Sequence, residues 1–142
     1  LYLQDRRADG TTPRWRGVTL LHEMKARGIP VAVASDNTRD PFYAYGDLDM
    51  LEVYRMATRI LHFDHPVADW PQAVTATPAK VMRFDGFGTL AAGGDADFIV
   101  FKGRSWTELL SRPESDRIVV RGGKAIDRQL PDYAELDELM VE

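Results

Sequence analysis

The sequence predicts an α/β protein, and three features of its 142 residues support this fold class. Apolar residues recur at helical spacing in two segments of the first half. A short apolar run rich in β-branched residues lies between those segments, which is typical of a strand in a parallel sheet. After residue 84, glycines divide the chain and two further short strands are predicted. An apolar content of 44% is enough for a buried core.

The chain opens with an apolar Leu-Tyr-Leu stretch that indicates a strand, followed by a polar turn. Because a complete domain seldom begins inside a core strand, we expect other segments of the protein to precede it. The first helix is predicted from Val18, Leu21 and Met24, which lie three residues apart. Gly28 stands where a glycine commonly ends a helix.

The central part of the predicted fold is the run 29–35, which is nearly all apolar. This composition favours a strand buried on both faces of a parallel sheet. A polar loop with two tyrosines follows, and a second helix is predicted from Met50, Val53, Ala57 and Ile60. Helix, strand, loop and helix therefore alternate.

Two short helices are expected between residues 69 and 82, because Asp69 and Thr77 each precede a proline suited to a first helical turn. The remainder is mainly β, with strands predicted at 97–101 and 117–121. Ser105 and Glu108 have the spacing of a capping box, which predicts a short helix between those strands. A last helix or a frayed end is expected over 133–142.

Composition excludes several classes of function. The net charge of −4, with acidic and basic residues interspersed, offers no positive stripe for a nucleic acid. No apolar run approaches the roughly 18 residues of a membrane helix, so no membrane partner is expected. The absence of cysteine removes disulfides and zinc–thiolate sites and fits a cytoplasmic location.

The candidate catalytic residue is Asp36, which directly follows the predicted strand 29–35. Side chains at the carboxyl ends of parallel strands face the ligand crevice in barrel and doubly wound folds, so a carboxylate there can meet substrate or metal. The alternative is that Asp36 caps a turn, which is common for Asp after a strand.

Several segments resemble, in the right order, the cytosine deaminases of the metal-dependent amidohydrolase superfamily. The first is Gly-Ile-Pro-Val-Ala-Val-Ala-Ser-Asp-Asn at 28–37, followed by Asp-Pro-Phe-Tyr at 40–43. Gly-Asp-Leu-Asp-Met-Leu at 46–51 and Ala-Thr-Pro-Ala at 76–79 are similar to later helices of that family. Gly-Asp-Ala-Asp-Phe-Ile-Val-Phe at 94–101 and Arg-Gly-Gly-Lys at 121–124 resemble its returning β segment.

This resemblance implies a (β/α)₈ TIM barrel with a small β-sandwich. Residues 1–83 would be the C-terminal third of the barrel, 84–128 the C-terminal strands of the sandwich, and 129–142 a tail. The missing N-terminal part of the same protein would be the principal partner, and a homo-oligomer is expected.

The resemblance also implies a metal-dependent hydrolytic deaminase acting on cytosine or a related aminopyrimidine. Asp36 would contact one divalent metal ion, zinc or iron, and shuttle protons for the attacking water, with the other ligands outside this chain. Asn37 and Phe42 match substrate-binding positions, although a loop cap and a packing role are equally compatible with them. Because Asn37 stands where the family often has Asp, isocytosine, a triazine or a cyclic amidine also remains open.

The three histidines match none of the family's ligand positions. His22 lies in the first predicted helix, and His62 and His65 follow the second. We therefore interpret all three as surface or packing residues.

Two other functions are compatible with parts of the sequence. Residues 20–37 also resemble the phosphate-binding segment of haloacid-dehalogenase-like phosphatases, and 84–90 resembles their nucleophile motif, but its second aspartate is missing and the order is reversed. Asp47 and Asp49 have the paired spacing without a preceding strand, which favours a helix N-terminus. The other alternative is a non-catalytic binding or assembly module.

Overall fold

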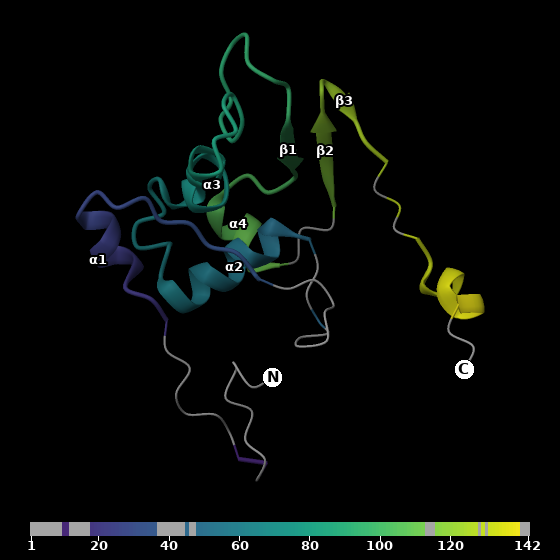
Figure 1. Cartoon of the computed structure of the whole chain (residues 1–142), viewed down its shortest axis with the longest axis horizontal. Coiled ribbons are helices and arrows are strands. Elements are labelled where there is room, and N and C mark those ends of the chain that lie inside the picture. Colours follow the sequence, from purple (N-terminus) through teal and green to yellow (C-terminus); the bar gives the residue numbers. More distant parts are fainter. Residues whose placement is uncertain are drawn as a thin grey trace.

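The computed structural model describes residues 10–11, 18–36, 45, 48–112, 116–127, 129 and 131–139 (Figure 1). Its helices are α1 (Leu21–Ala26), α2 (Met50–Leu61), α3 (Ala76–Val81) and α4 (Trp106–Ser111), with 3₁₀ helices η1 (Trp70–Val74) and η2 (Tyr133–Leu139). Its strands are β1 (Phe98–Phe101), β2 (Arg117–Arg121) and β3 (Lys124–Ala125). None of the described helices has the length and apolarity needed to cross a bilayer.

The core lies where α1, α2 and η1 meet. Phe63 is fully buried and stacks on Trp70, with ring centroids 4.1 Å apart and planes within 5° of parallel. This pair joins the segment after α2 to the start of η1. The buried members of the core cluster are Leu21, Val31, Tyr54, Ala57, Phe63, Trp70 and Ala73.

Both predicted helices form, but α1 begins at Leu21, so Val18 lies outside it. Gly28 has φ 74°, a conformation that glycine adopts without steric cost, and it follows α1. At the start of α2, Asp49 accepts a hydrogen bond from the Leu51 N–H at 2.9 Å, so it is the N-cap. His62 ends α2 in the left-handed conformation, with φ 58°.

Two short helices follow as predicted, but the expected caps do not form. Trp70–Val74 is a 3₁₀ helix, and the Asp69 carboxylate accepts from Lys25 Nζ at 2.8 Å rather than from the helix N-terminus. Thr77 lies inside α3, whose N-cap position is Thr75. The Thr75 hydroxyl donates to the Pro71 carbonyl, so it too leaves α3 without a side-chain cap.

The strands form a three-stranded antiparallel sheet in the order β1-β2-β3. Phe98 pairs with Val120, and Phe101 pairs with Arg117. The predicted helix between β1 and β2 is α4, and Ser105 Oγ accepts from the Glu108 N–H as expected. None of the residues in the three strands is buried. The sheet therefore has no core of its own among the described residues.

The predicted strand at 29–35 does not form. No described strand pairs with this segment, and Val33 N–H donates instead to the Ala73 carbonyl at 3.1 Å. Val31 is buried and Val33 half-buried, whereas Ala32 and Ala34 are exposed. The segment thus covers the helical core with one side only, because the described residues supply neither neighbouring strands nor a second covering layer. The strand predicted at 1–3 lies outside the described residues.

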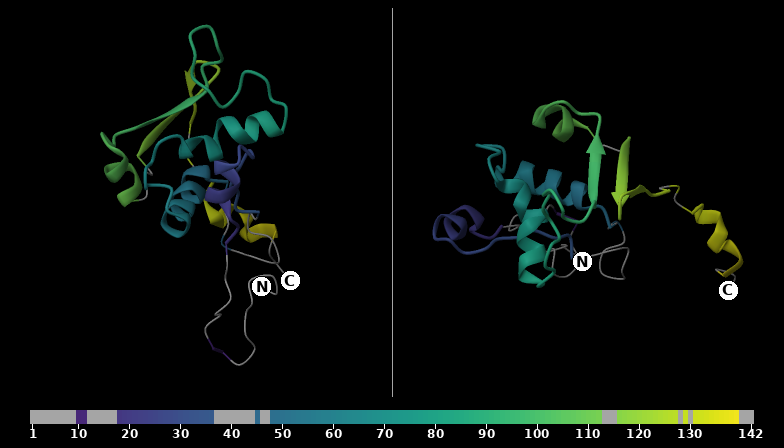
Figure 2. Two further views of the ribbon diagram at one scale, coloured as in Figure 1. Left: turned by 90° about the vertical axis from the view of Figure 1, so that its left-hand side faces the viewer. Right: turned by 90° about the horizontal axis from the view of Figure 1, so that it is seen from above.

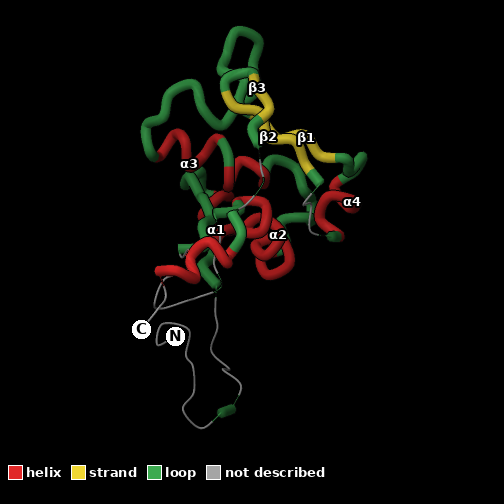
Figure 3. Tube along the Cα trace, turned by 90° about the vertical axis from the view of Figure 1, so that its right-hand side faces the viewer, coloured by secondary structure: helices red, strands yellow, loops and turns green. Residues whose placement is uncertain are grey.

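Hydrogen bonds join the sheet and α4 to the helical cluster, and α4 lies beside α2 (Figures 1 and 3). Arg117 at the start of β2 donates to both carboxylate oxygens of Asp49, at 2.9 and 2.7 Å. Arg55 Nε in α2 donates to the carbonyl of Leu110 in α4 at 3.5 Å, and Leu110 packs against the core. In contrast, η2 has no buried residue and lies apart from the other elements (Figures 1 and 2).

Candidate functional site

The predicted catalytic residue, Asp36, lies at the exposed end of the segment that follows α1. Its φ of 60° places it in the left-handed region, which Asp and Asn tolerate better than other side chains with a Cβ. Such conformations are enriched at functional sites. Buried Val31 and the hydrogen bond from Val33 to Ala73 fix the preceding residues. Asp36 is therefore a solvent-accessible carboxylate at the end of an anchored segment.

The predicted substrate residues, Asn37 and Phe42, lie outside the described residues. Their positions relative to Asp36 stay predictions.

The predicted role of Asp36 as a metal ligand requires further ligands. A catalytic zinc commonly has three protein ligands, and Asp36 supplies one carboxylate. Among the described residues, the histidines and acids that lie close enough together to hold an ion do not include Asp36. A metal site at Asp36 would therefore need its other ligands from outside the described residues.

Of the three histidines, His22 is an exposed residue whose ring packs on the core, which agrees with the predicted surface or packing role. Its ring meets Trp70 edge-on with centroids 4.6 Å apart, and its Nε2 contacts the Leu61 carbonyl. His62 and His65 are exposed, also as predicted, but they form a group with Asp64. One ligand atom from each of these three residues lies within 4.8 Å of the others.

This His62–Asp64–His65 group was not predicted from the sequence, because neither histidine alone matches a ligand pattern. His65 Nδ1 and Asp64 Oδ1 are 2.9 Å apart. The hydrogen bond with His65 holds the pKa of the Asp64 carboxyl below its usual value, and the charges of His65 and His62 act in the same direction. The signal available in the sequence was the spacing His-x-Asp-His directly after a helix end.

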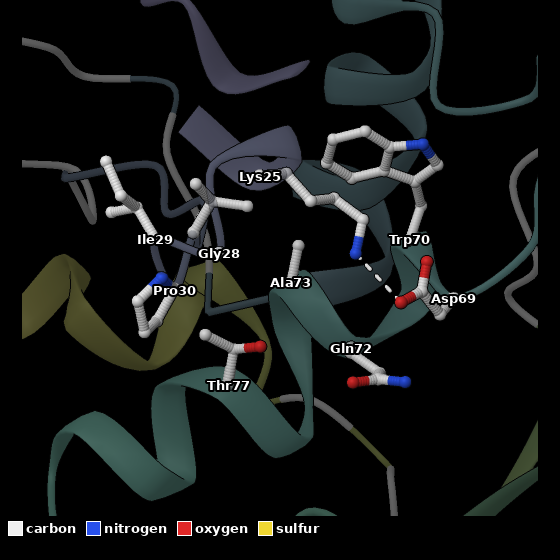
Figure 4. A pocket seen from close by; sticks show the side chains of 10 residues that line it. Lys25, Gly28, Ile29, Pro30, Asp69, Trp70, Gln72, Ala73 and Thr77 are labelled. Carbon is white, nitrogen blue, oxygen red and sulfur yellow. Dashed lines mark hydrogen bonds and ion pairs between the residues drawn. The ribbon is translucent and has the colours of Figure 1, made fainter. Parts of the chain in front are cut away.

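A shallow cleft of about 180 Å³ lies between α1, η1 and residues 28–31 (Figure 4). Lys25 Nζ lies 2.8 Å from the Asp69 carboxylate and 5.1 Å from the centroid of a Trp70 ring. The hydrogen bond from Lys25 lowers the pKa of Asp69. The cleft adjoins the beginning of the segment whose end is Asp36. Asp36 is not among the residues that line the cleft, so the cleft is separate from the candidate site.

The carboxylates of the phosphatase alternative have other roles here. Asp49 caps α2 and binds Arg117, and Asp85 lies in an exposed turn after α3. Neither follows a strand, as a phosphatase nucleophile of this type would. Burial raises the pKa of Asp49, but hydrogen bonds from Arg117 and Leu51 outweigh it, so its pKa lies below the ordinary value. Asp49 is thus a structural carboxylate.

Comparisons with known proteins give a consistent picture. Residues 2–127 match the amidohydrolase family. A pterin deaminase of Rhizobium rhizogenes is 61% identical over 140 residues, which are 99% of this chain and 32% of that protein. The crystal structure of 5-methylcytosine deaminase from Klebsiella pneumoniae with 5-fluorocytosine has a TM-score of 0.67 and 26% identity, over 87% of this chain and 30% of that one. The same enzyme with phosphonocytosine gives a TM-score of 0.66 and 24% identity, over 86% and 30% of the two chains. The chain spans about a third of the length of these relatives.

Proposed function

The chain belongs to the amidohydrolase family, and from this membership we propose that the whole protein is a metal-dependent hydrolytic deaminase. The solved relatives imply a TIM-barrel type of fold for it. Both named relatives are deaminases of amino-substituted nitrogen heterocycles, and this shared chemistry is the observation that carries the proposal. The phosphatase, triazine and cyclic amidine alternatives gain no support from these relatives.

For the substrate we propose a pterin. The pterin deaminase is 61% identical to this chain, whereas the 5-methylcytosine deaminase is 26% identical. A pterin contains a 2-amino-4-oxopyrimidine ring, which is the aminopyrimidine unit of isocytosine. In hydrolytic deamination, water adds to the ring carbon that bears the amino group. A C–O bond forms, the C–N bond breaks, and ammonia leaves with a proton taken from the water.

Asp36 is the residue that we assign to the proton transfers. As an accessible carboxylate on an anchored backbone, it is suited to accept the proton of the attacking water and deliver it to the leaving amino group. Family members use a divalent metal ion, which when bound lowers the pKa of its water toward about 7. Asp36 would supply one ligand to that ion. Asn37 and Phe42 are the side chains that we propose to contact the ring.

The proposed arrangement assigns residues 1–83 to the last third of the barrel, 84–128 to the sandwich and 129–142 to a tail. It is supported by the change from a helical cluster to an antiparallel sheet after α3. The identity of the metal as zinc or iron, the cytoplasmic location and the homo-oligomeric state stay predictions.

Substitution of Asp36 in the complete protein tests this function. Asp36→Asn keeps a residue that tolerates the left-handed backbone and removes the base. We expect ammonia release from pterin to fall by about 10²- to 10⁴-fold, the usual contribution of a general acid–base. Far-ultraviolet circular dichroism and metal content should change little.

Asp85→Asn is the matched control, because Asp85 is an exposed carboxylate elsewhere in the chain. It should retain full turnover. Undiminished turnover in Asp36→Asn would refute the assigned role. The deaminase proposal would be refuted if the unaltered protein released ammonia from neither pterin nor cytosine. Faster turnover of cytosine than of pterin would overturn only the proposal that the substrate is a pterin.

A further inference from the structure

The turn after α2 holds three potential metal ligands on the outside of the molecule. His62 is the C-cap of α2, and its N–H donates to the Thr58 carbonyl at 2.9 Å. Phe63, next along the chain, is fully buried and stacked on Trp70. This anchor fixes the backbone in the middle of the His62–Asp64–His65 group. The three polar side chains are therefore presented by a turn that the core already holds in place.

The donor set is that of a borderline transition-metal ion. Two imidazoles and a carboxylate suit zinc and its neighbours, whereas magnesium and calcium prefer oxygen ligands throughout. Two ligand atoms bound to a tetrahedral zinc lie roughly 3.3 Å apart, given bond lengths of about 2.0–2.1 Å. In the group the ligand atoms lie within 4.8 Å of one another. All three side chains are exposed, so they can change rotamer without disturbing the core.

The charges around the turn also favour a cation. The C-terminal end of α2, a helix of 12 residues, carries partial negative charge on its last carbonyls. The Asp64 carboxylate adds a full negative charge at neutral pH. Arg59, in the last turn of α2, opposes this field. The bound ion would replace the present hydrogen bond between Asp64 and His65 with bonds to both side chains.

We propose that His62, Asp64 and His65 bind one zinc ion, or a similar borderline divalent ion, at the end of α2. This site is independent of the proposed deaminase function and does not include Asp36. Three protein ligands leave a fourth position of a tetrahedral ion open to water.

Zinc titration of the complete protein, purified with its resident metal, tests the site. The variants are His62→Asn, which keeps a residue suited to the left-handed cap, and His65→Gln. By isothermal titration calorimetry, the unaltered protein should bind one more zinc per chain than the double variant. Each single substitution should weaken this binding by about tenfold or more. Asp85→Asn should bind zinc as the unaltered protein does.

Two further measurements separate the site from general effects. Thermal melting of the double variant should match that of the unaltered protein, since both histidines are exposed. Magnesium should give no binding that depends on these histidines. Equal zinc binding by the double variant and the unaltered protein would overturn the proposal, as would equal loss of binding in Asp85→Asn.

Discussion

The helical cluster at 18–82 and the sheet formed by β1, β2 and β3 differ in what they bury. The cluster holds fully buried Phe63 within a set of seven buried apolar residues. The strands bury none, and Ile99, Val100 and Ile118 are about half exposed. Both regions have regular backbone hydrogen bonding. Local pattern therefore produces secondary structure in each, but tight packing arises only where the described chain also supplies apolar partners.

Phe63→Ala should have the largest effect on stability. Removing a fully buried ring leaves a cavity against Trp70, and we expect a loss of about 3–5 kcal/mol in the free energy of unfolding. Phe101→Ala in β1 removes the same side chain from a half-buried position and should cost about 1–2 kcal/mol. Urea denaturation of the two variants measures both values. Equal losses would contradict the contrast in packing between the helical cluster and the sheet.

Asp49→Asn should have an intermediate effect, because it breaks the ion pair that joins the two regions and keeps an N-cap residue. We expect a loss of about 2 kcal/mol at neutral pH. The pKa of Asp49 is lowered by folding, so its contribution is present above the unfolded value of about 3.9 and is lost as pH falls through the folded value.

Denaturation at a series of pH values checks the direction of this pH dependence. The difference in stability between the unaltered protein and Asp49→Asn should be constant above pH 5 or so and shrink below about pH 4. Asp85→Asn should show no such difference. A stability difference that grows as the pH falls would show that the ionised Asp49 carboxylate does not hold the two regions together.

Ser105→Ala should have the smallest effect. It removes the hydroxyl that accepts from the Glu108 N–H at 3.2 Å, and we expect a loss of about 1 kcal/mol. Hydrogen exchange should quicken at the amides of α4 and stay unchanged in α2. Ser105→Asp should restore slow exchange, and unchanged exchange in Ser105→Ala would show that the cap contributes nothing.

The fold was largely predictable where a pattern is local. The spacing of Met50, Val53 and Ala57 predicted α2, and the capping box at Ser105 predicted α4. The strand at 29–35 was predicted from composition, yet a strand needs neighbours for its hydrogen bonds, and no local pattern reveals whether they are close. The cap at Asp69 failed for a related reason: Lys25, which lies far away in the sequence, binds the Asp69 carboxylate. The cap at Thr77 failed because α3 already begins at Ala76.

The sequence indicated the position of Asp36 but not the second group of potential ligands. The position of Asp36 at the end of an anchored segment follows from its place after an apolar run. The His62–Asp64–His65 group was not predicted, because its proximity depends on the left-handed end of α2 and on the burial of Phe63 between the ligands. Neither property follows from the identity of a single histidine.

The bond between Asp49 and Arg117 constrains the order in which the chain assembles. Its partners are 68 residues apart, and closing a loop of that size from an open chain costs about 4 kcal/mol of entropy. An ion pair that contributes about 2 kcal/mol cannot offset this alone. Once Leu110 has docked on the helical core, only a short loop separates it from Arg117. We therefore expect α4 to dock first and the ion pair to hold β2 in place afterwards.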